Sequence, residues 1–475
     1  MHWIDLTIFA VYLLAMLGIG YYYLRSNTSK EDYFLAGRNM SPWQIGLSVV
    51  ATDVGGGFSI GLGGLGFLMG LSGSWMLFTG LLGAWLAAVF LIPKVFELGK
   101  KVDLFTFPQI FETIFDKRVA LVAAVISAIG YLGFTASQML AGAKLAHATF
   151  PSVSLDMILV IMGVVAVVYT VMGGLKAVIV TDTIQWIILL LGLMFIGLPM
   201  GYWAVGGWEG ITAAVGPEML ALNNLSWQNI INWSFTIIPI WFIGMTLYQR
   251  IYASRNVKQA KKAWFIAGVF EWPIMAFMGV ALGLLARVGA DQGMFEFAGY
   301  ATAAGMDPEI GLPLLLRTIL PVGLMGLMMS AYFSAILSTA DSCIMACSGN
   351  VVSDLMFKLK YFRDKNELRL SQIVTLGIGA AAIIIALYME NVLELMLHSY
   401  AFMVSGLFIP VIYGFYSKSP SAQAALASML AGGGVTLILT GLSLSLPYGL
   451  DPIVFGLTAG LLALLGVARL KTVKT

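Results

Sequence analysis

Long runs of apolar residues alternate with short polar connections along almost the whole chain. Thirteen of these runs are long enough for a helix to cross a lipid bilayer, which takes roughly 20 residues. The runs cover residues 4–25, 42–70, 73–98, 119–148, 155–173, 177–204, 226–253, 260–288, 320–354, 369–389, 391–416, 421–443 and 452–469. The pattern therefore predicts an all-α polytopic membrane protein with 13 transmembrane helices.

The composition supports this prediction. Of the 475 residues, 59% are hydrophobic and only 11% are charged, and the mean hydropathy is +0.90. Soluble domains carry about 25% charged residues, so a soluble protein is excluded. We expect the lipid bilayer as the surrounding medium and no nucleic-acid partner. Cys343 and Cys347 lie four residues apart on one predicted helix face, and we interpret them as small core residues.

Lysine and arginine residues gather on one side of the predicted membrane. With the N-terminus outside, 23 of the 26 fall on the inner side, among them Arg250 in a basic connection. The outer side keeps only Lys144, Arg287 and Arg317, and Lys144 is expected to meet water. Because positive charge marks cytoplasmic loops, this predicts a multi-pass plasma-membrane protein (bacterial inner membrane) with a cytoplasmic C-terminus.

The second apolar run is interrupted at its centre by Asp53 and by glycines at 55–57. A carboxylate at mid-membrane costs roughly 2.5–3.5 kcal/mol on insertion scales, and each glycine weakens a helix by about 1 kcal/mol relative to alanine. A helix that only had to cross the membrane would avoid both. The pattern therefore predicts a broken helix whose free backbone groups and carboxylate face a ligand cavity.

A second interruption is expected at Ser234–Pro239, because proline removes one helical hydrogen bond. The two breaks open two groups of five predicted helices, and five is an odd number, so the second group would be inverted. This predicts one transporter domain over 1–475 with an extra N-terminal helix at 4–25. The first repeat would cover 42–204, the second 226–416, and two C-terminal helices would lie at 421–469.

Other function classes lack the residues they would need. No P-loop pattern occurs in the inner connections, which disfavours an ATP-driven pump. The three histidines, His2, His147 and His398, are too scattered for a metal or catalytic site, so we expect no enzyme. A transporter-like sensor is disfavoured because no signalling domain follows the last predicted helix.

Three motifs resemble the sodium/solute symporter family. They are Gly173–Gln185 (GGLKAVIVTDTIQ), Tyr248–Arg250 (YQR) and Ala335–Ser342 (AILSTADS), and they occur in the family's order. The resemblance covers nearly the whole chain, with local likeness to the proline and choline branches. It implies a LeuT-like fold with a 5+5 inverted repeat and sodium-driven uptake of a small organic solute, with no organic cofactor.

A sodium site is predicted between the broken helix and the ninth run. Ala335, Ser338 and Thr339 lie on one helix face, where two hydroxyls and a carbonyl supply oxygen ligands. The carbonyls of Ala51 and Val54, freed by the glycines, supply the rest, and these five positions match the family's common sodium site by resemblance. The alternative is that the hydroxyls only bond the preceding turn.

A second sodium is also considered. By resemblance, Asp182 together with Ser342 and the other hydroxyls of the ninth run would bind it, while the alternative is that Asp182 pairs locally with Lys176 or Thr181. Asp341 lies off the sodium face. A proton in place of sodium remains an alternative, with Asp53 or Asp182 as the titrating group.

The predicted substrate site is built around Asp53. By resemblance, the proline branch has an aspartate here, which suits an amine, and aromatic faces also stabilise cations. The further candidates are a glycine, three aromatic residues and a side-chain amide: Gly56, Phe134, Trp241, Phe242 and Gln138. Glu271 is a second intramembrane carboxylate, for which packing and function are equally favoured.

These observations predict a sodium-coupled symporter that imports a small amine-bearing solute, such as proline or a choline- or betaine-like compound. A sugar needs many polar partners, yet Ser59 is the only polar residue between Gly55 and Gly70. Carboxylate or sugar-type solutes remain the alternative. We expect a monomer to suffice for function.

Overall fold

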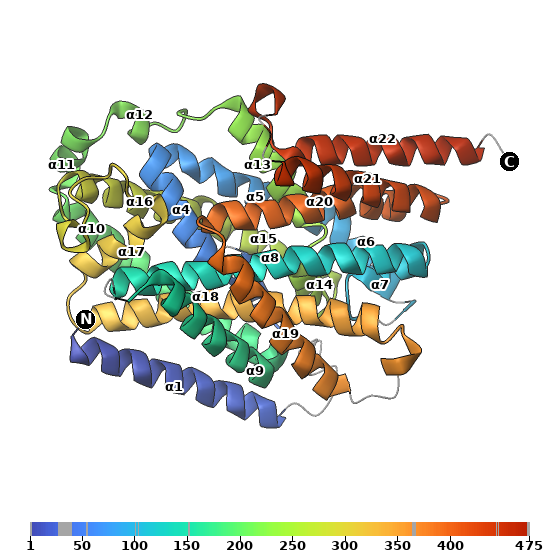
Figure 1. The fold of residues 1–475 in the computed structure, drawn as a ribbon, viewed down its shortest axis with the longest axis horizontal. Coiled ribbons are helices and arrows are strands. Elements are labelled where there is room, and N and C mark those ends of the chain that lie inside the picture. Colours follow the sequence, from blue (N-terminus) through green and yellow to red (C-terminus); the bar gives the residue numbers. More distant parts are fainter. Residues whose placement is uncertain are drawn as a thin grey trace.

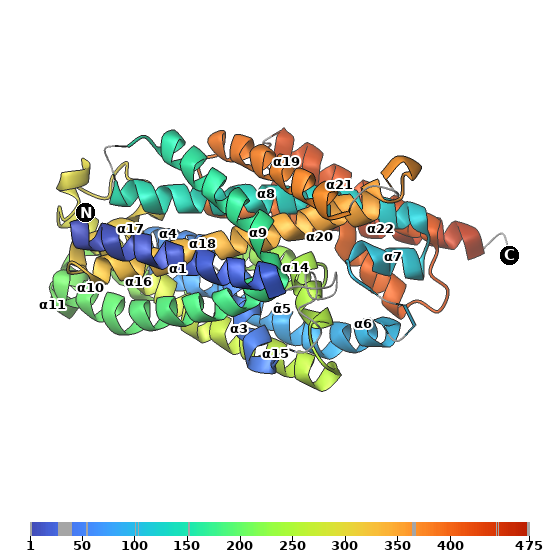
Figure 2. The ribbon, with the colours of Figure 1, turned by 90° about the horizontal axis from the view of Figure 1, so that it is seen from below.

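The computed structural model describes residues 2–26, 40–53, 56–99, 101–102, 104–150, 153–362, 367–442, 444 and 446–472. Within these residues the fold is helical, apart from an isolated bridge between Met40 and Ser254. Most of the long helices run along the longest axis of the molecule (Figure 1), and a view from below shows them stacked in several layers (Figure 2). The prediction of an all-α fold is confirmed.

The first half of the chain forms helices that follow the apolar runs. Their bounds are α1 (Trp3–Ser26), α3 (Pro42–Asp53), α4 (Gly56–Met69), η2 (Gly70–Ser74), α5 (Trp75–Leu86), η3 (Ala87–Leu91), α6 (Ile92–Gly99), α7 (Pro108–Ile114), α8 (Lys117–Thr149), α9 (Leu155–Gly192), η4 (Leu193–Gly197), α10 (Leu198–Ala204), α11 (Gly207–Ala214) and α12 (Pro217–Leu220).

The second half continues in the same way. Its helices are α13 (Trp227–Ile240), α14 (Met245–Tyr252), α15 (Val257–Val269), η5 (Phe270–Met275), α16 (Ala276–Asp291), η6 (Glu296–Ala298), α17 (Pro308–Ile319), α18 (Leu324–Gly349), η7 (Asn350–Met356), η8 (Lys360–Phe362), α19 (Glu367–Leu387), α20 (Val392–Tyr416), α21 (Ala422–Gly441), η9 (Pro447–Gly449) and α22 (Pro452–Thr472).

The described residues contain ten helical stretches long and apolar enough to cross a membrane. Two shorter apolar helices, Trp3–Tyr12 and Leu155–Val168, come in addition. The structure joins some runs that the sequence pattern separates, because α9 continues from Leu155 to Gly192 across the predicted connection near residue 175. The count of thirteen therefore stays a prediction.

One of the two predicted helix breaks has a counterpart in the described residues. Helix α3 is described as far as Asp53 and α4 from Gly56 onward, and residues 54 and 55, where the first break is predicted, lie outside the described part. The second break falls slightly later than predicted, since α13 continues through Pro239 to Ile240 and α14 begins at Met245. The N–H of Phe242 bonds the carbonyl of Pro239 at 2.9 Å, which tightens the last turn before the chain leaves the helix.

Helix α18 forms the centre of the protein. It packs against α8, α9 and α1, and nearly all of its residues are buried. Helices α3, α4 and α14 also contact it, so the helices on which the two breaks are predicted meet at α18. Cys343 and Cys347 are buried free cysteines on this helix, as the sequence predicts.

Candidate functional site

Three of the five predicted sodium residues meet where α3 ends beside α18. The hydroxyl of Thr339 lies 3.1 Å from the carbonyl of Ala51 and 3.1 Å from that of Ala335, and it can donate to either. All three residues are at most 3% exposed. A hydroxyl has one proton, so its oxygen keeps lone pairs that can face a cation. Val54, the fourth predicted residue, lies outside the described residues.

Ser338 bonds Asp182, with which the hydroxyls of the ninth run were expected to act. Its hydroxyl donates to the carboxylate of Asp182, which also accepts a hydrogen bond of 2.9 Å from Ser48 on α3. Asp182 is 1% exposed, so its carboxylate lies inside the protein. These contacts run across the core to α3 and α18, and Asp182 is therefore part of the centre of the site.

Arg250 lies in the core of this site, although its charge predicted a position in a cytoplasmic connection. We counted it among the basic residues of an inner connection, but its side chain on α14 is fully buried. Its guanidinium lies 3.4 Å from the carboxylate of Asp182 and donates to the hydroxyls of Thr52 at 2.6 Å and Ser342 at 3.2 Å. A further bond of 3.2 Å reaches Ser48. The guanidinium thus supplies positive charge where a second sodium was predicted.

Asp53, at the last turn of α3, is buried with 7% exposure. Its carboxylate accepts a hydrogen bond of 3.3 Å from the hydroxyl of Tyr400 on α20. The ring of Phe134 lies edge-on against Tyr400, with centroids 5.0 Å apart. Only Thr52 therefore separates a candidate sodium ligand, Ala51, from a carboxylate that bonds the aromatic residue Tyr400.

The other predicted substrate residues have partners of their own. Trp241 is fully buried and packs edge-on against Trp264, and Phe242 packs against Phe408. Gln138 is 1% exposed and its side-chain carbonyl oxygen has no hydrogen-bond partner. Gly56 is the first described residue of α4. Of the predicted set, only Phe134 is joined to Asp53 through a described contact chain.

A family model described as "Sodium:solute symporter family" matches residues 33–432 of this chain. The chain belongs to this family. The resemblance read from the three motifs is thereby confirmed, and the protein is in the class of membrane transporters for which sodium is the coupling ion.

Relatives within the sodium:solute symporter family differ in solute. The "Osmoregulated proline transporter OpuE" of Bacillus subtilis is 27% identical over 95% of this chain and 92% of its own. The "Sodium/glucose cotransporter" of Vibrio parahaemolyticus is 26% identical over 94% of this chain and 86% of its own. The names therefore leave the solute of this symporter open.

Solved structures show the same fold. A Na⁺-coupled sialic acid symporter in a substrate-bound outward-open state matches with a TM-score of 0.77 at 21% identity, covering 98% of this chain and 97% of its own. Mhp1, a nucleobase-cation-symport-1 family transporter, matches with a TM-score of 0.58 at 16% identity, covering 93% and 95%. The symporter therefore has the expected LeuT-like architecture.

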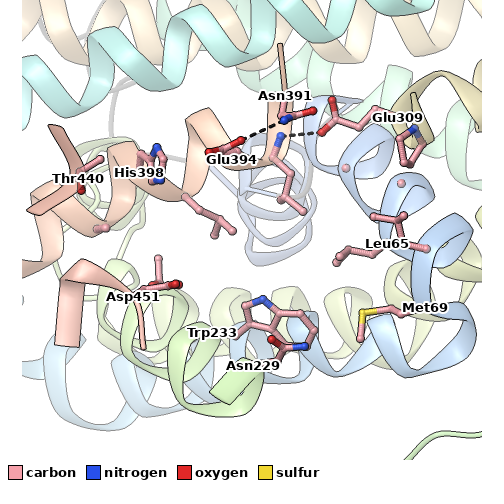
Figure 3. A pocket seen from close by; sticks show the side chains of 18 of the residues that line it. Leu65, Met69, Asn229, Trp233, Glu309, Asn391, Glu394, His398, Thr440 and Asp451 are labelled. Carbon is pink, nitrogen blue, oxygen red and sulfur yellow. Dashed lines mark hydrogen bonds between the residues drawn. The ribbon is translucent and has the colours of Figure 1, made fainter. Parts of the chain in front are cut away.

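A cavity of about 520 Å³ lies apart from these residues, between α4, α13, α20 and the start of α22. Figure 3 shows its polar lining, including Asn229, Glu394, His398 and Asp451. None of the predicted sodium or substrate residues lines it. Burial raises the pKa of Asp451, and the nearby His398 opposes this effect.

Lys144 near this cavity corrects another expectation. It is 2% exposed rather than in water, and its ammonium lies 2.6 Å from the carboxylates of both Asp307 and Glu309. Glu309 also accepts the N–H groups of Val392 and Leu393 at the start of α20. These contacts fix α17 to α8 and α20.

Proposed function

We propose that the protein is a sodium-coupled symporter that imports a small amine-bearing organic solute by alternating access. The observation that carries this proposal is the buried carboxylate of Asp53 at the end of α3. It lies two positions from the candidate sodium ligand Ala51 and bonds Tyr400, whose ring packs edge-on against Phe134. A carboxylate among aromatic rings suits an ammonium group.

The proposed sodium site consists of the carbonyls of Ala51, Val54 and Ala335 with the hydroxyls of Ser338 and Thr339. The approach of Thr339 to two of these carbonyls supports it. Sodium binding would turn the Thr339 proton away from the carbonyls and place three oxygens around the ion. Asp182 and Ser342 remain the candidate ligands of a second sodium ion. That ion would have to displace the guanidinium of Arg250.

We propose that two groups of helices move relative to each other during alternating access. The two groups of helices, 42–204 and 226–416, would form the 5+5 inverted repeat, each beginning with a broken helix. We also propose that the N-terminus faces outward and the C-terminus the cytoplasm, and that one chain suffices for transport.

A sugar-type solute is the second candidate, since one of the similar proteins is named as a glucose cotransporter. Ser59, the one polar residue between Gly55 and Gly70, donates its hydroxyl to Tyr332 at 2.8 Å. Because this hydroxyl is already bonded, fewer polar groups are available to bind a sugar. The contact therefore favours an amine-bearing solute.

Uptake into proteoliposomes tests the proposal. An inward sodium gradient with a potential of about 100 mV adds roughly 2.3 kcal/mol per ion to the driving force. We expect accumulation of a radiolabelled amine such as proline or choline with sodium outside and none with potassium. Accumulation of glucose instead would favour the second candidate, and uptake that follows a pH gradient without sodium would replace sodium by a proton.

A further inference from the structure

Glu271 is a buried carboxyl group whose role the sodium site leaves unexplained. It lies in η5, between α15 and α16, and is 0% exposed. Neither of its oxygens has a hydrogen-bond donor in the described structure. An unpaired buried carboxyl group is costly, so a sequence that keeps one has a reason in a ligand or a partner.

The structure places this group directly beside Asp53. The two carboxyl groups interact with each other across the ends of η5 and α3. Among the described side chains, the hydroxyl of Tyr400 is the one donor that reaches Asp53, and no lysine or arginine bonds either carboxyl group. Arg250, which is buried on α14, is already paired with Asp182.

Helix α5 makes room for Glu271. A Cβ atom at Gly80 would lie 1.9 Å from the carboxylate oxygen Oε2, so a glycine is required there for the present position of the group. One turn further, a Cβ at Gly83 would lie 2.4 Å from the ring of Trp241. Trp241, whose indole N–H has no partner among the described residues, therefore lies within about one helical turn of Glu271.

We infer that Glu271 is a substrate-binding residue that forms, with Asp53, a two-carboxyl receptor for an organic cation with at least two N–H donors and no carboxylate of its own. This inference rests on the proposed function and narrows its solute class. Two N–H groups would satisfy both carboxyl groups. Two adjoining buried carboxyl groups share one proton, so one monovalent organic cation would also balance the single negative charge that the pair keeps.

An amino acid fits this receptor less well. Its carboxylate would add a second negative charge beside the one that Asp53 and Glu271 share, where no described cationic side chain is available. A quaternary ammonium brings the charge but no N–H donor, so neither carboxyl group would gain a hydrogen bond from it. The receptor therefore selects primary or secondary amines and guanidinium groups.

Three probes with one ring test this selection by titration calorimetry on the full-length protein in sodium and in potassium. They are pyrrolidine, L-proline, which adds a carboxylate, and N,N-dimethylpyrrolidinium, which lacks N–H. We expect sodium-dependent binding of pyrrolidine at least about tenfold tighter than that of the other two. Glu271→Gln should weaken pyrrolidine binding by about 10- to 100-fold and leave L-proline binding unchanged or stronger.

Two further variants keep the result interpretable. Gly80→Ala displaces the Glu271 carboxyl group without removing it and should weaken pyrrolidine in the same direction. The exposed Glu390→Gln is the matched control and should change nothing. Thermal unfolding without ligand checks that each variant is folded.

The outcomes separate the two proposals. Sodium-dependent binding of L-proline as tight as that of pyrrolidine, or an unchanged affinity in Glu271→Gln, overturns the receptor and leaves the amine symporter standing. Failure of all three probes to bind wild-type protein in sodium overturns both.

Discussion

The buried pair of Asp182 and Arg250 offers the sharpest test of how the core is held together. Asp182 is on α9 and Arg250 on α14, and both side chains are fully buried. We consider Asp182→Asn, Arg250→Met and the double variant. Each single change leaves one charge buried without its partner, whereas the double change removes both charges.

The structure sets the expected magnitudes. At 3.4 Å and an effective dielectric constant of about 20, the attraction between the two charges is about 5 kcal/mol. Desolvation of the two ions costs several kcal/mol each and offsets much of this gain. Removing one partner is nevertheless expected to cost about 3–5 kcal/mol, because the other charge stays buried. The double variant should be at least about 1 kcal/mol more stable than the sum of the single changes predicts.

The free energy of unfolding in detergent micelles, measured by denaturant titration, provides the assay. The control is Arg287→Gln, because Arg287 forms a partly exposed pair with Asp291 at 2.7 Å. Such a pair is worth at most about 1 kcal/mol, so this variant should change stability little. Additivity of the Asp182 and Arg250 changes within about 0.5 kcal/mol would refute the claim that the two charges depend on each other.

The remaining predictions concern transport and helix packing. Ser338→Ala and Thr339→Ala should each raise the sodium concentration for half-maximal uptake, and unchanged sodium dependence in both would remove the site assignment. Asp53→Asn should abolish amine uptake while the protein stays folded, so normal uptake would place the substrate elsewhere. Gly283→Ala would bring a Cβ to 2.0 Å from a backbone carbonyl of α4 and should destabilise the protein by about 1–3 kcal/mol. Gly377→Ala, where a Cβ has nothing within 4 Å, should be neutral or stabilising by up to about 1 kcal/mol, and equal unfolding temperatures for the two variants would contradict the packing argument.

Local sequence patterns predicted the helices and their interruptions. The break after Ile240 follows from Pro239. This signal lies within a few residues of its effect. The number of membrane crossings was harder to predict, because α9 continues through Gly173 and Gly174 where a connection was expected.

The partners of the site residues could not be read from one sequence. Arg250 and Asp182 are 68 residues apart, and Tyr400 and Asp53 are 347 residues apart. A hydrogen bond over such separations leaves no periodicity in the chain. The motif Tyr248–Arg250 marked Arg250 as notable, but the preference of arginine for cytoplasmic connections pointed to the wrong environment. Burial, which only the fold shows, decided its role.

The last turn of α3 explains how one ion and one solute could depend on each other. Three consecutive residues point in three directions, because each step around a helix turns by about 100°. The carbonyl of Ala51 meets Thr339 on α18, the hydroxyl of Thr52 meets Arg250 on α14, and the carboxylate of Asp53 meets Tyr400 on α20. Under the proposed function, an ion that draws the Ala51 carbonyl toward α18 must also rotate this turn, and with it Asp53. Arg250 resists that rotation through Thr52, so α14, which follows the second break, takes part in the same motion. Coupling between ion and solute would then require only this single turn.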